Sequence, residues 1–176
     1  MLKNMPSSKR KRAQHYEFAV SACLAGENCN FKGGNYLVGK LRDMVLSKIA
    51  LPVCPEKLAG LPAPRGPFEI IGGGGRDVLL SNARVLSENG RDATSDFING
   101  AKQALSIIKK HNIKKVILKT KSPSCSCDQI YDGTFSGSLI AGSGVFAQLL
   151  IQNEIAVYTQ LNYLSGYKSK KSKKRP

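Results

Sequence analysis

The chain has 176 residues, of which 41% are hydrophobic, and it carries a formal net charge of +15. That length and composition indicate one globular domain with a buried core and exclude a wholly disordered chain. No run of about 18 apolar residues occurs, so no membrane-spanning helix is expected, and the first residues lack the apolar segment of a secretory signal. We therefore expect a cytoplasmic protein in a reducing compartment, where its five cysteines would not form a disulfide framework.

Most of the positive charge is concentrated at the two ends of the chain. Residues 1–15 contain five lysines and arginines without an acid, and residues 167–176 contain six without an acid. We interpret both segments as disordered basic tails that flank one domain at residues 16–166. Two roles stay open for the tails, because they can simply increase solubility or can attract RNA weakly in a salt-dependent manner.

Strand and helix patterns alternate along the first half of the body. Aromatic and β-branched residues predict a strand at residues 16–22, and apolar residues at helical spacing predict a helix at 35–50. A short apolar run at 49–53 is predicted to be a buried strand. Residues 54–75 are rich in proline and glycine, which indicates an ordered or ligand-binding loop. Residues 77–92 contain two short apolar runs with turn residues and are predicted to form a hairpin.

The second half of the body continues the alternation. Residues 94–112 begin with Thr, Ser and Asp, which favour a helix N-terminus, and continue with an apolar stripe at helical spacing. A strand is predicted at 114–120, a helix at 143–154 and a final strand at 155–160. Strands that alternate with helices are typical of a parallel sheet with helices on both faces. The predicted fold class is therefore α/β, as a single domain with a mostly parallel sheet.

Three cysteines follow predicted strands. Cys23 and Cys54 come directly after the first two strands, and Cys125 comes five residues after the third. The carboxyl ends of parallel strands meet at one edge of the sheet, where open α/β sheets bind ligands, so these thiols can converge there. Soft thiolates at one point would select zinc, copper(I) or an iron–sulfur cluster, although the CxxC pair of common zinc sites is absent. The alternative is that each cysteine is a small buried apolar residue.

Four segments of the chain resemble successive motifs of one bacterial family, the TudS-like 2-thiouracil desulfidases. They are VSACLAGENCNFKGG, PVCPEKLAGLPAPRGPFEI, LKTKSPSCSCDQIYDGTFSG and GSGVFAQLLIQNEI, and they occur in that order between residues 17 and 160. The resemblance implies a three-layer α/β domain with a [4Fe-4S] cluster held by Cys23, Cys54 and Cys125, and one iron without a protein ligand. It also implies that a small thiolated uracil, as base or nucleotide, is hydrolysed to uracil or uridylate and sulfide.

Side chains near the cysteines are candidates for proton transfer. The resemblance implies a carboxylate and a hydroxyl shortly before the second and third cysteines, but apolar residues occupy the carboxylate position here. Glu56 is the nearest acid by sequence and could protonate a leaving group or activate water, or could be a loop carboxylate that binds backbone. We expect Glu56, Ser122 and Ser124 to act in catalysis and the Thr120 hydroxyl to contact substrate.

Two features suggest contacts to an anionic part of the substrate. Arg65 can bind an anion with its bidentate guanidinium fork. Residues 142–144, with the sequence GSG, open a predicted helix and could offer N–H groups to a phosphate, which would favour a nucleotide over a free base. The glycine run at 72–75 matches neither the dinucleotide-binding nor the P-loop pattern.

Two cysteines have no role in this scheme. Cys29 follows Cys23 by six residues and either lines the same pocket or packs in the fold. Cys127 departs from the family motif and is either a fourth ligand that closes the open iron or a bystander thiol that points away. Three functions therefore stay open: the desulfidase, a nonenzymatic metal- or iron–sulfur-binding module, and an RNA-associated protein that acts through its tails. The sequence does not determine the oligomeric state.

Overall fold

The computed structural model describes residues 14–171, and its centre is a four-stranded parallel sheet in the order β2-β1-β5-β8. The strands are β1 (Phe18–Ser21), β2 (Ala50–Val53), β5 (Lys115–Leu118) and β8 (Ala156–Thr159). β1 pairs with both β2 and β5, and β5 pairs with β8, all in parallel. The predicted parallel sheet is therefore confirmed.

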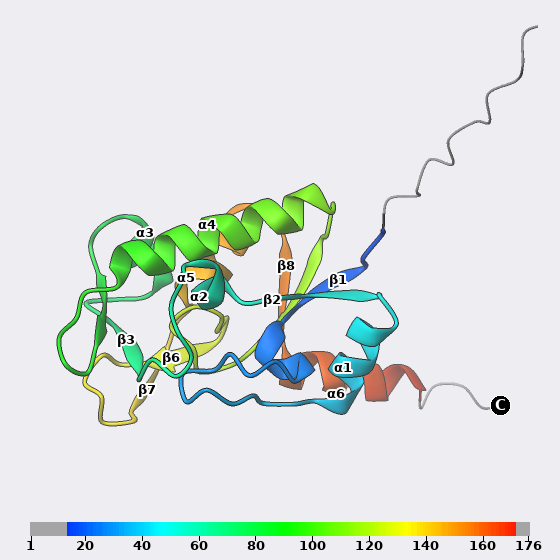
Figure 1. The fold of residues 1–176 in the computed structure, drawn as a ribbon, viewed down its shortest axis with the longest axis horizontal. Helices are drawn as coiled ribbons and strands as arrows, with labels where there is room; N and C mark the ends of the chain where they lie inside the picture. The colour runs from blue at the N-terminus through cyan, green and yellow to red at the C-terminus, as the bar shows by residue number, and fades with distance from the viewer. Residues whose placement is uncertain (1–13, 172–176) are drawn as a thin grey trace, which may run out of the picture.

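Helices cover both faces of this sheet and complete a three-layer α/β domain, with α4 above the strands and α1 and α6 below them in Figure 1. The main helices are α1 (Gly39–Leu46), α4 (Thr94–Lys110), α5 (Val145–Gln152) and α6 (Gln160–Lys171). Alternate strand residues face the two helix layers. Val116 and Leu118 of β5 pack with residues of α4 and α5, whereas Ile117 packs with Leu41 of α1.

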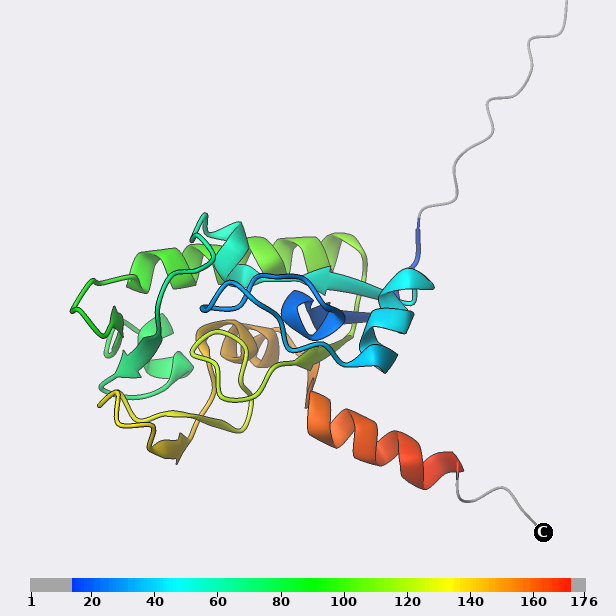
Figure 2. The ribbon, with the colours of Figure 1, turned by 60° about the horizontal axis from the view of Figure 1, so that its bottom comes forward.

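Shorter elements lie beyond the carboxyl ends of the strands, toward the left of Figures 1 and 2. They are η1 (Ala22–Ala25), α2 (Pro55–Leu58), β3 (Phe68–Ile71), α3 (Gly75–Leu79), β4 (Arg84–Ser87), β6 (Gln129–Tyr131) and β7 (Leu139–Ala141). β3 pairs antiparallel with β4, and β6 pairs antiparallel with β7. These elements build the walls around the carboxyl edge of the sheet.

The hairpin predicted at residues 77–92 is wrong. Its first apolar run belongs to α3, because Val78 is fully buried against the core, and its second run is β4, which pairs with β3. α6, which had not been predicted, follows β8 directly, so the domain boundary expected at residue 166 falls inside a helix. The rest of the predicted basic tails lies largely outside the described residues. No helix within residues 14–171 is long and apolar enough to cross a bilayer.

Candidate active site

A cavity of about 300 Å³ lies at the carboxyl edge of the sheet, and four cysteines line it. Cys23 comes from η1 after β1, Cys54 precedes α2 after β2, and Cys125 lies in the loop after β5. Cys29, in the loop that follows η1, also lines the cavity. The predicted convergence of Cys23, Cys54 and Cys125 at this edge is therefore present, and the cavity has the size of a small ligand site.

Local backbone geometry positions the first two of these cysteines. Cys23 lies in a single 3-10 turn that ends at Gly26, where a φ of 99° favours glycine. Cys54 is the extended residue immediately before α2. α2 packs closely on α4 at Gly100, because any Cβ there would collide with the carbonyl oxygen of Pro55. The missing side chain of Gly100 therefore allows α2, and Cys54 with it, to lie close to the core.

The loop that carries Cys125 is held by a serine and by the start of α5. Ser122 Oγ accepts the N–H groups of Ser124 at 3.2 Å and Cys125 at 3.1 Å. The first N–H groups of α5 bind the carbonyl oxygens of Pro123 and Ser124. A Cβ on Gly144 would lie 2.5 Å from the Ser124 carbonyl carbon, so glycine is required there. The phosphate site predicted at residues 142–144 is wrong, because the cysteine loop occupies that helix N-terminus.

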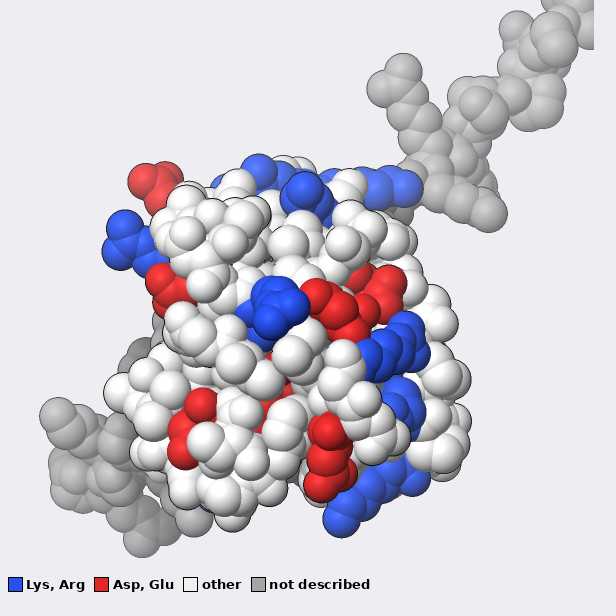
Figure 3. Space-filling view, turned by 90° about the vertical axis from the view of Figure 1, so that its left-hand side faces the viewer, with Lys and Arg blue, Asp and Glu red and all other residues white. Residues whose placement is uncertain are grey.

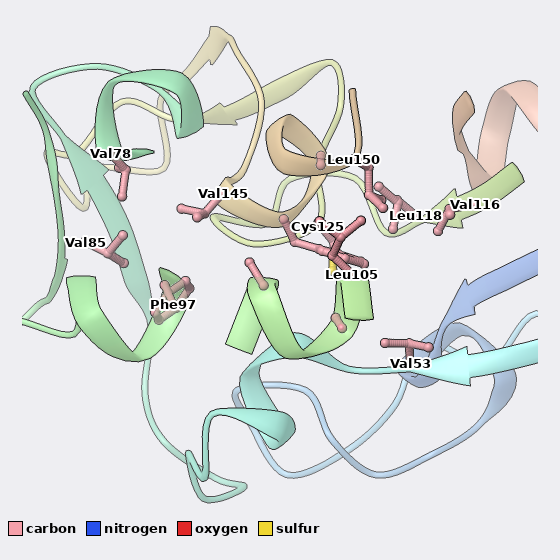
Figure 4. Packing of buried hydrophobic residues seen from close by; sticks show 14 of the residues in the cluster. Val53, Val78, Val85, Phe97, Leu105, Val116, Leu118, Cys125, Val145 and Leu150 are labelled. Atoms are coloured by element: carbon pink, nitrogen blue, oxygen red, sulfur yellow. The ribbon is translucent and has the colours of Figure 1, made fainter. Parts of the chain in front are cut away.

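Cys125 links the cavity to the hydrophobic core. Its side chain is 7% exposed and lies close to Leu105 of α4 and Leu118 of β5 (Figure 4). Burial raises the pKa of the Cys125 thiol, while the hydroxyl of Ser21 acts in the opposite direction. Because cysteine binds a metal as the thiolate, a metal centre here would release the thiol proton of Cys125.

Cys29 lies between two of the predicted cluster ligands. It is 1% exposed and lines the cavity together with both of them. The neighbouring thiol of Cys23 and then burial raise the pKa of Cys29 to about 12, although the thiol of Cys54 acts in the opposite direction. The neighbouring thiol of Cys29, followed by burial, raises the pKa of Cys54. Of the two alternatives for Cys29, the structure therefore supports a position in the pocket.

Cys127 differs from the other four cysteines in its relation to the cavity. It does not line the cavity, and its half-buried side chain packs against the core formed with α4 and α5. Burial raises the pKa of its thiol to about 11. Ser126 fixes the turn before it, because Ser126 Oγ donates to the Gln129 carbonyl oxygen at 2.6 Å. This geometry supports the bystander alternative.

Glu56 is held in a buried network at the cavity wall. Glu56 Oε2 accepts Arg65 Nε at 2.6 Å, and Glu56 Oε1 accepts the hydroxyl of Ser124 at 2.9 Å. Arg65 also donates to the carbonyl oxygens of Pro62 at 3.1 Å and Cys29 at 3.0 Å. The donors of Arg65 are thus engaged by protein groups, which leaves its predicted contact with a substrate anion without support. Arg65 instead ties Glu56 to the loop of Cys29.

The remaining predicted hydroxyls differ in their access to the cavity. Ser122 lines it, whereas Ser124 is buried behind Glu56 and does not. Thr120 is turned toward α6: Gln160 Nε2 donates to Thr120 Oγ1 at 3.2 Å, and Gln160 Oε1 accepts the Thr120 N–H at 3.1 Å. Thr120 is not among the lining residues, so its predicted substrate contact has no geometric support.

The structure adds lining residues that had not been predicted. Aromatic side chains form much of the outer wall, namely Phe31, Tyr36, Phe68, Tyr131 and Phe135. Glu69 is buried, and its Oε2 accepts the N–H groups of Gly133 at 3.0 Å and Phe135 at 3.1 Å. Lys119 lies in the inner wall beside Tyr36. The aromatic content of the YDGTFSG motif could have indicated a wall for a flat ring, but these wall residues come from three different segments.

The thiols around the cavity are a donor set that an iron–sulfur cluster can use. Among residues 14–171, no three His, Cys, Asp or Glu side chains are close enough together to hold one metal ion. An iron–sulfur cluster spreads its thiolate ligands over several irons, so it needs cysteines around a cavity rather than at one point. Cys23, Cys54 and Cys125 surround the cavity from three separate loops, and this donor set matches that need.

Comparisons with known proteins agree with this geometry. Residues 18–162 match the family model described as 2-thiouracil desulfurase. The uncharacterized protein YbbK of Bacillus subtilis (strain 168) is 47% identical over 133 residues, which cover 76% of this chain and 88% of YbbK. A solved structure of the [4Fe-4S]-dependent thiouracil desulfidase TudS superimposes with a TM-score of 0.73 at 33% identity, covering 85% of this chain and 97% of TudS.

Proposed function

The chain belongs to the 2-thiouracil desulfurase family, and we propose that it is a desulfidase that hydrolyses the C–S bond of a thiolated uracil. Water supplies the oxygen and two protons: the thiocarbonyl and water become a carbonyl and hydrogen sulfide, with no net oxidation or reduction. The observation that carries the proposal is the convergence of Cys23, Cys54 and Cys125 on one cavity in a chain of this family.

We assign a [4Fe-4S] cluster to these three cysteines. The similarity to the [4Fe-4S]-dependent TudS supports the cluster type, and the thiols that line the cavity are the ligands that iron–sulfur clusters use. When bound, the cluster supplies a soft Lewis acid to which a thiocarbonyl sulfur can bind. Cys127 is not among the residues that line the cavity, which supports a site without a fourth thiol ligand from that position. A reducing cytoplasm is the setting that we propose for such a centre.

We propose that Glu56 moves the protons of the reaction. Its carboxylate faces the cavity and can accept a proton from the attacking water, then return it to the departing sulfur. Arg65 and Ser124 hold the carboxylate from behind through the bonds described above, so that it need not reorient during turnover. The hydroxyl of Ser122, whose oxygen already accepts two backbone N–H groups, can donate to a substrate atom in the cavity.

Of the two substrate forms considered, we favour the free base. The helix N-terminus that could have bound a phosphate is occupied by the Cys125 loop, and the guanidinium of Arg65 is paired with Glu56. A cavity of about 300 Å³ must also hold the cluster, which leaves little room for a ribose phosphate. The aromatic outer wall suits a flat pyrimidine ring.

Anaerobic reconstitution tests this function directly. The purified chain is loaded with iron and sulfide, its visible spectrum and iron content are measured, and it is incubated with 2-thiouracil. We expect uracil and sulfide in equal amounts, with oxygen from labelled water in the uracil. Replacement of Cys54 by Ala should remove both iron and turnover, whereas the matched replacement of Cys127 by Ala should remove neither. An iron-loaded Cys54→Ala protein would contradict the ligand assignment.

Two alternatives have distinct outcomes in the same experiment. A nonenzymatic cluster-binding module would hold iron without releasing sulfide. An RNA-associated protein would bind RNA after loss of all cysteines but not after deletion of the basic segments 1–15 and 167–176. Figure 3 gives no support for RNA binding by the face of the domain that it presents, because Lys and Arg are interspersed there with Asp and Glu.

A further inference from the structure

Lys119 is a half-buried cation at the inner wall of the cavity. It directly follows β5, and its side chain lines the cavity together with Cys23 and Cys125. Its Nζ donates to the Thr120 carbonyl oxygen at 2.6 Å and lies 4.5 Å from the ring centroid of Tyr36. Burial lowers the pKa of Lys119, while the neighbouring thiols of Cys23 and Cys125 act in the opposite direction. An ammonium group is thus kept at some cost beside the predicted cluster ligands.

The other charged groups of the cavity do not neutralise Lys119. Glu56 is paired with Arg65, and the carboxylate of Glu69 accepts two backbone N–H groups. Glu88 and Lys121 line the cavity from exposed positions at its rim. Within residues 14–171 no carboxylate forms a salt bridge with Lys119. The ion pairs within residues 14–171 therefore do not account for the position of this charge.

The ammonium of Lys119 is anchored in place rather than free to swing outward. The backbone N–H of Lys119 donates to Ser21 Oγ at 3.1 Å, and this bond holds the Lys119 backbone against the end of β1. The Thr120 backbone that accepts its Nζ is held in turn by Gln160 of α6. The ring of Tyr36 packs on the ammonium through a cation–π contact. A charge that is fixed before reaction stabilises developing charge better than one that must reorient.

We propose that Lys119 is the anion-binding residue of this site: it stabilises the negative charge that develops on the thiocarbonyl sulfur as the C–S bond breaks, and it binds the hydrosulfide product. This inference rests on the proposed desulfidase function. The ligand that the ammonium recognises is a small sulfur anion close to Cys23 and Cys125. Because the wall is partly buried, the attraction between ammonium and anion is screened less than at the surface.

Titration of the cluster-loaded protein with sodium sulfide, followed by the visible spectrum, tests the inference. Lys119→Met removes the charge but keeps an unbranched apolar side chain, and we expect it to weaken hydrosulfide binding by about tenfold or more. Lys119→Arg keeps the charge and should restore most of the affinity. Lys115→Met is the matched control, because Lys115 begins the strand that Lys119 follows, makes a similar cation–π contact, to Phe18 at 5.2 Å, and does not line the cavity.

Turnover supplies a second readout that a structural role would not mimic. Stabilisation of charge only in the transition state predicts that Lys119→Met lowers kcat while KM for 2-thiouracil changes little. The inference would be overturned if Lys119→Met bound hydrosulfide with an affinity within about twofold of that of the unmodified protein at equal iron content. It would also be overturned if the unmodified protein bound no hydrosulfide. A loaded protein that binds hydrosulfide but releases no uracil would instead refute the proposed function and leave the binding comparison valid.

Discussion

The Glu56–Arg65 pair provides the sharpest stability test of the site. The two side chains are 12% and 3% exposed, and Arg65 binds Glu56 while donating to two carbonyl oxygens. Replacing Arg65 with Met leaves a buried carboxylate without its counter-charge and two carbonyl groups without a donor. Removing one partner of a buried ion pair typically costs about 3–5 kcal/mol, and we expect a loss of that size in the free energy of unfolding of the metal-free protein.

A second ion pair close by offers an internal control. Lys57 Nζ, also on α2, lies 3.3 Å from Glu27 Oε2 in the loop that carries Cys29. Its side chains are 53% and 44% exposed, so solvent screens the pair and Lys57→Met should cost only about 0.2–1 kcal/mol. The contrast between the two substitutions isolates the effect of burial.

Urea unfolding monitored by circular dichroism measures both losses, and an unchanged slope with denaturant would show that the unfolding reaction itself is the same. The double variant Glu56→Met with Arg65→Met should recover part of the stability, because it removes the unpaired charge. A loss for Arg65→Met below about 1 kcal/mol, or no larger than that for Lys57→Met, would refute the claim that Arg65 holds Glu56 in a buried network.

Three other predictions concern the cysteine loops and their thiols. Gly144→Ala should displace the Cys125 loop and speed iron loss to a chelator, whereas Gly39→Ala should not, because a Cβ at Gly39 meets no atom within 4 Å. Equal rates of iron loss from the two variants would contradict the close packing at Gly144. Cys127→Gly should leave sulfide release from 2-thiouracil unchanged, and a large rise would mean that this thiol caps the cluster. Folding raises the pKa of Cys54, so above pH about 8.5 unfolded chains release a thiol proton that the folded metal-free protein retains. The free energy of unfolding should therefore fall with rising pH. Cys54→Ala should reduce this fall, and an identical pH profile for both proteins in urea unfolding would contradict it.

The four strands of the parallel sheet could be predicted because they depend on local patterns, whereas β3, inside the predicted loop, and β6 and β7 were not predicted. Each strand is a short apolar run, and α4 carries an apolar stripe that becomes the face packed on the core. The same local information failed at α3, where a short apolar run next to glycines predicts a strand as well as a helix. Tertiary packing decides between strand and helix here, because β4 pairs with β3, whereas α3 buries Val78.

The sequence by itself determined that Cys23, Cys54 and Cys125 follow parallel strands, and the topology of a parallel sheet then brings them to one edge. Only the tertiary structure decided which other groups join them. It brings Cys29 into the pocket, turns Thr120 toward α6, pairs Arg65 with Glu56 and fixes Lys119 beside the thiols. The physical reason is that strand formation follows the periodicity of neighbouring residues, whereas hydrogen-bond and charge partners come from loops far apart in the chain, and their choice is made by the packing of those loops.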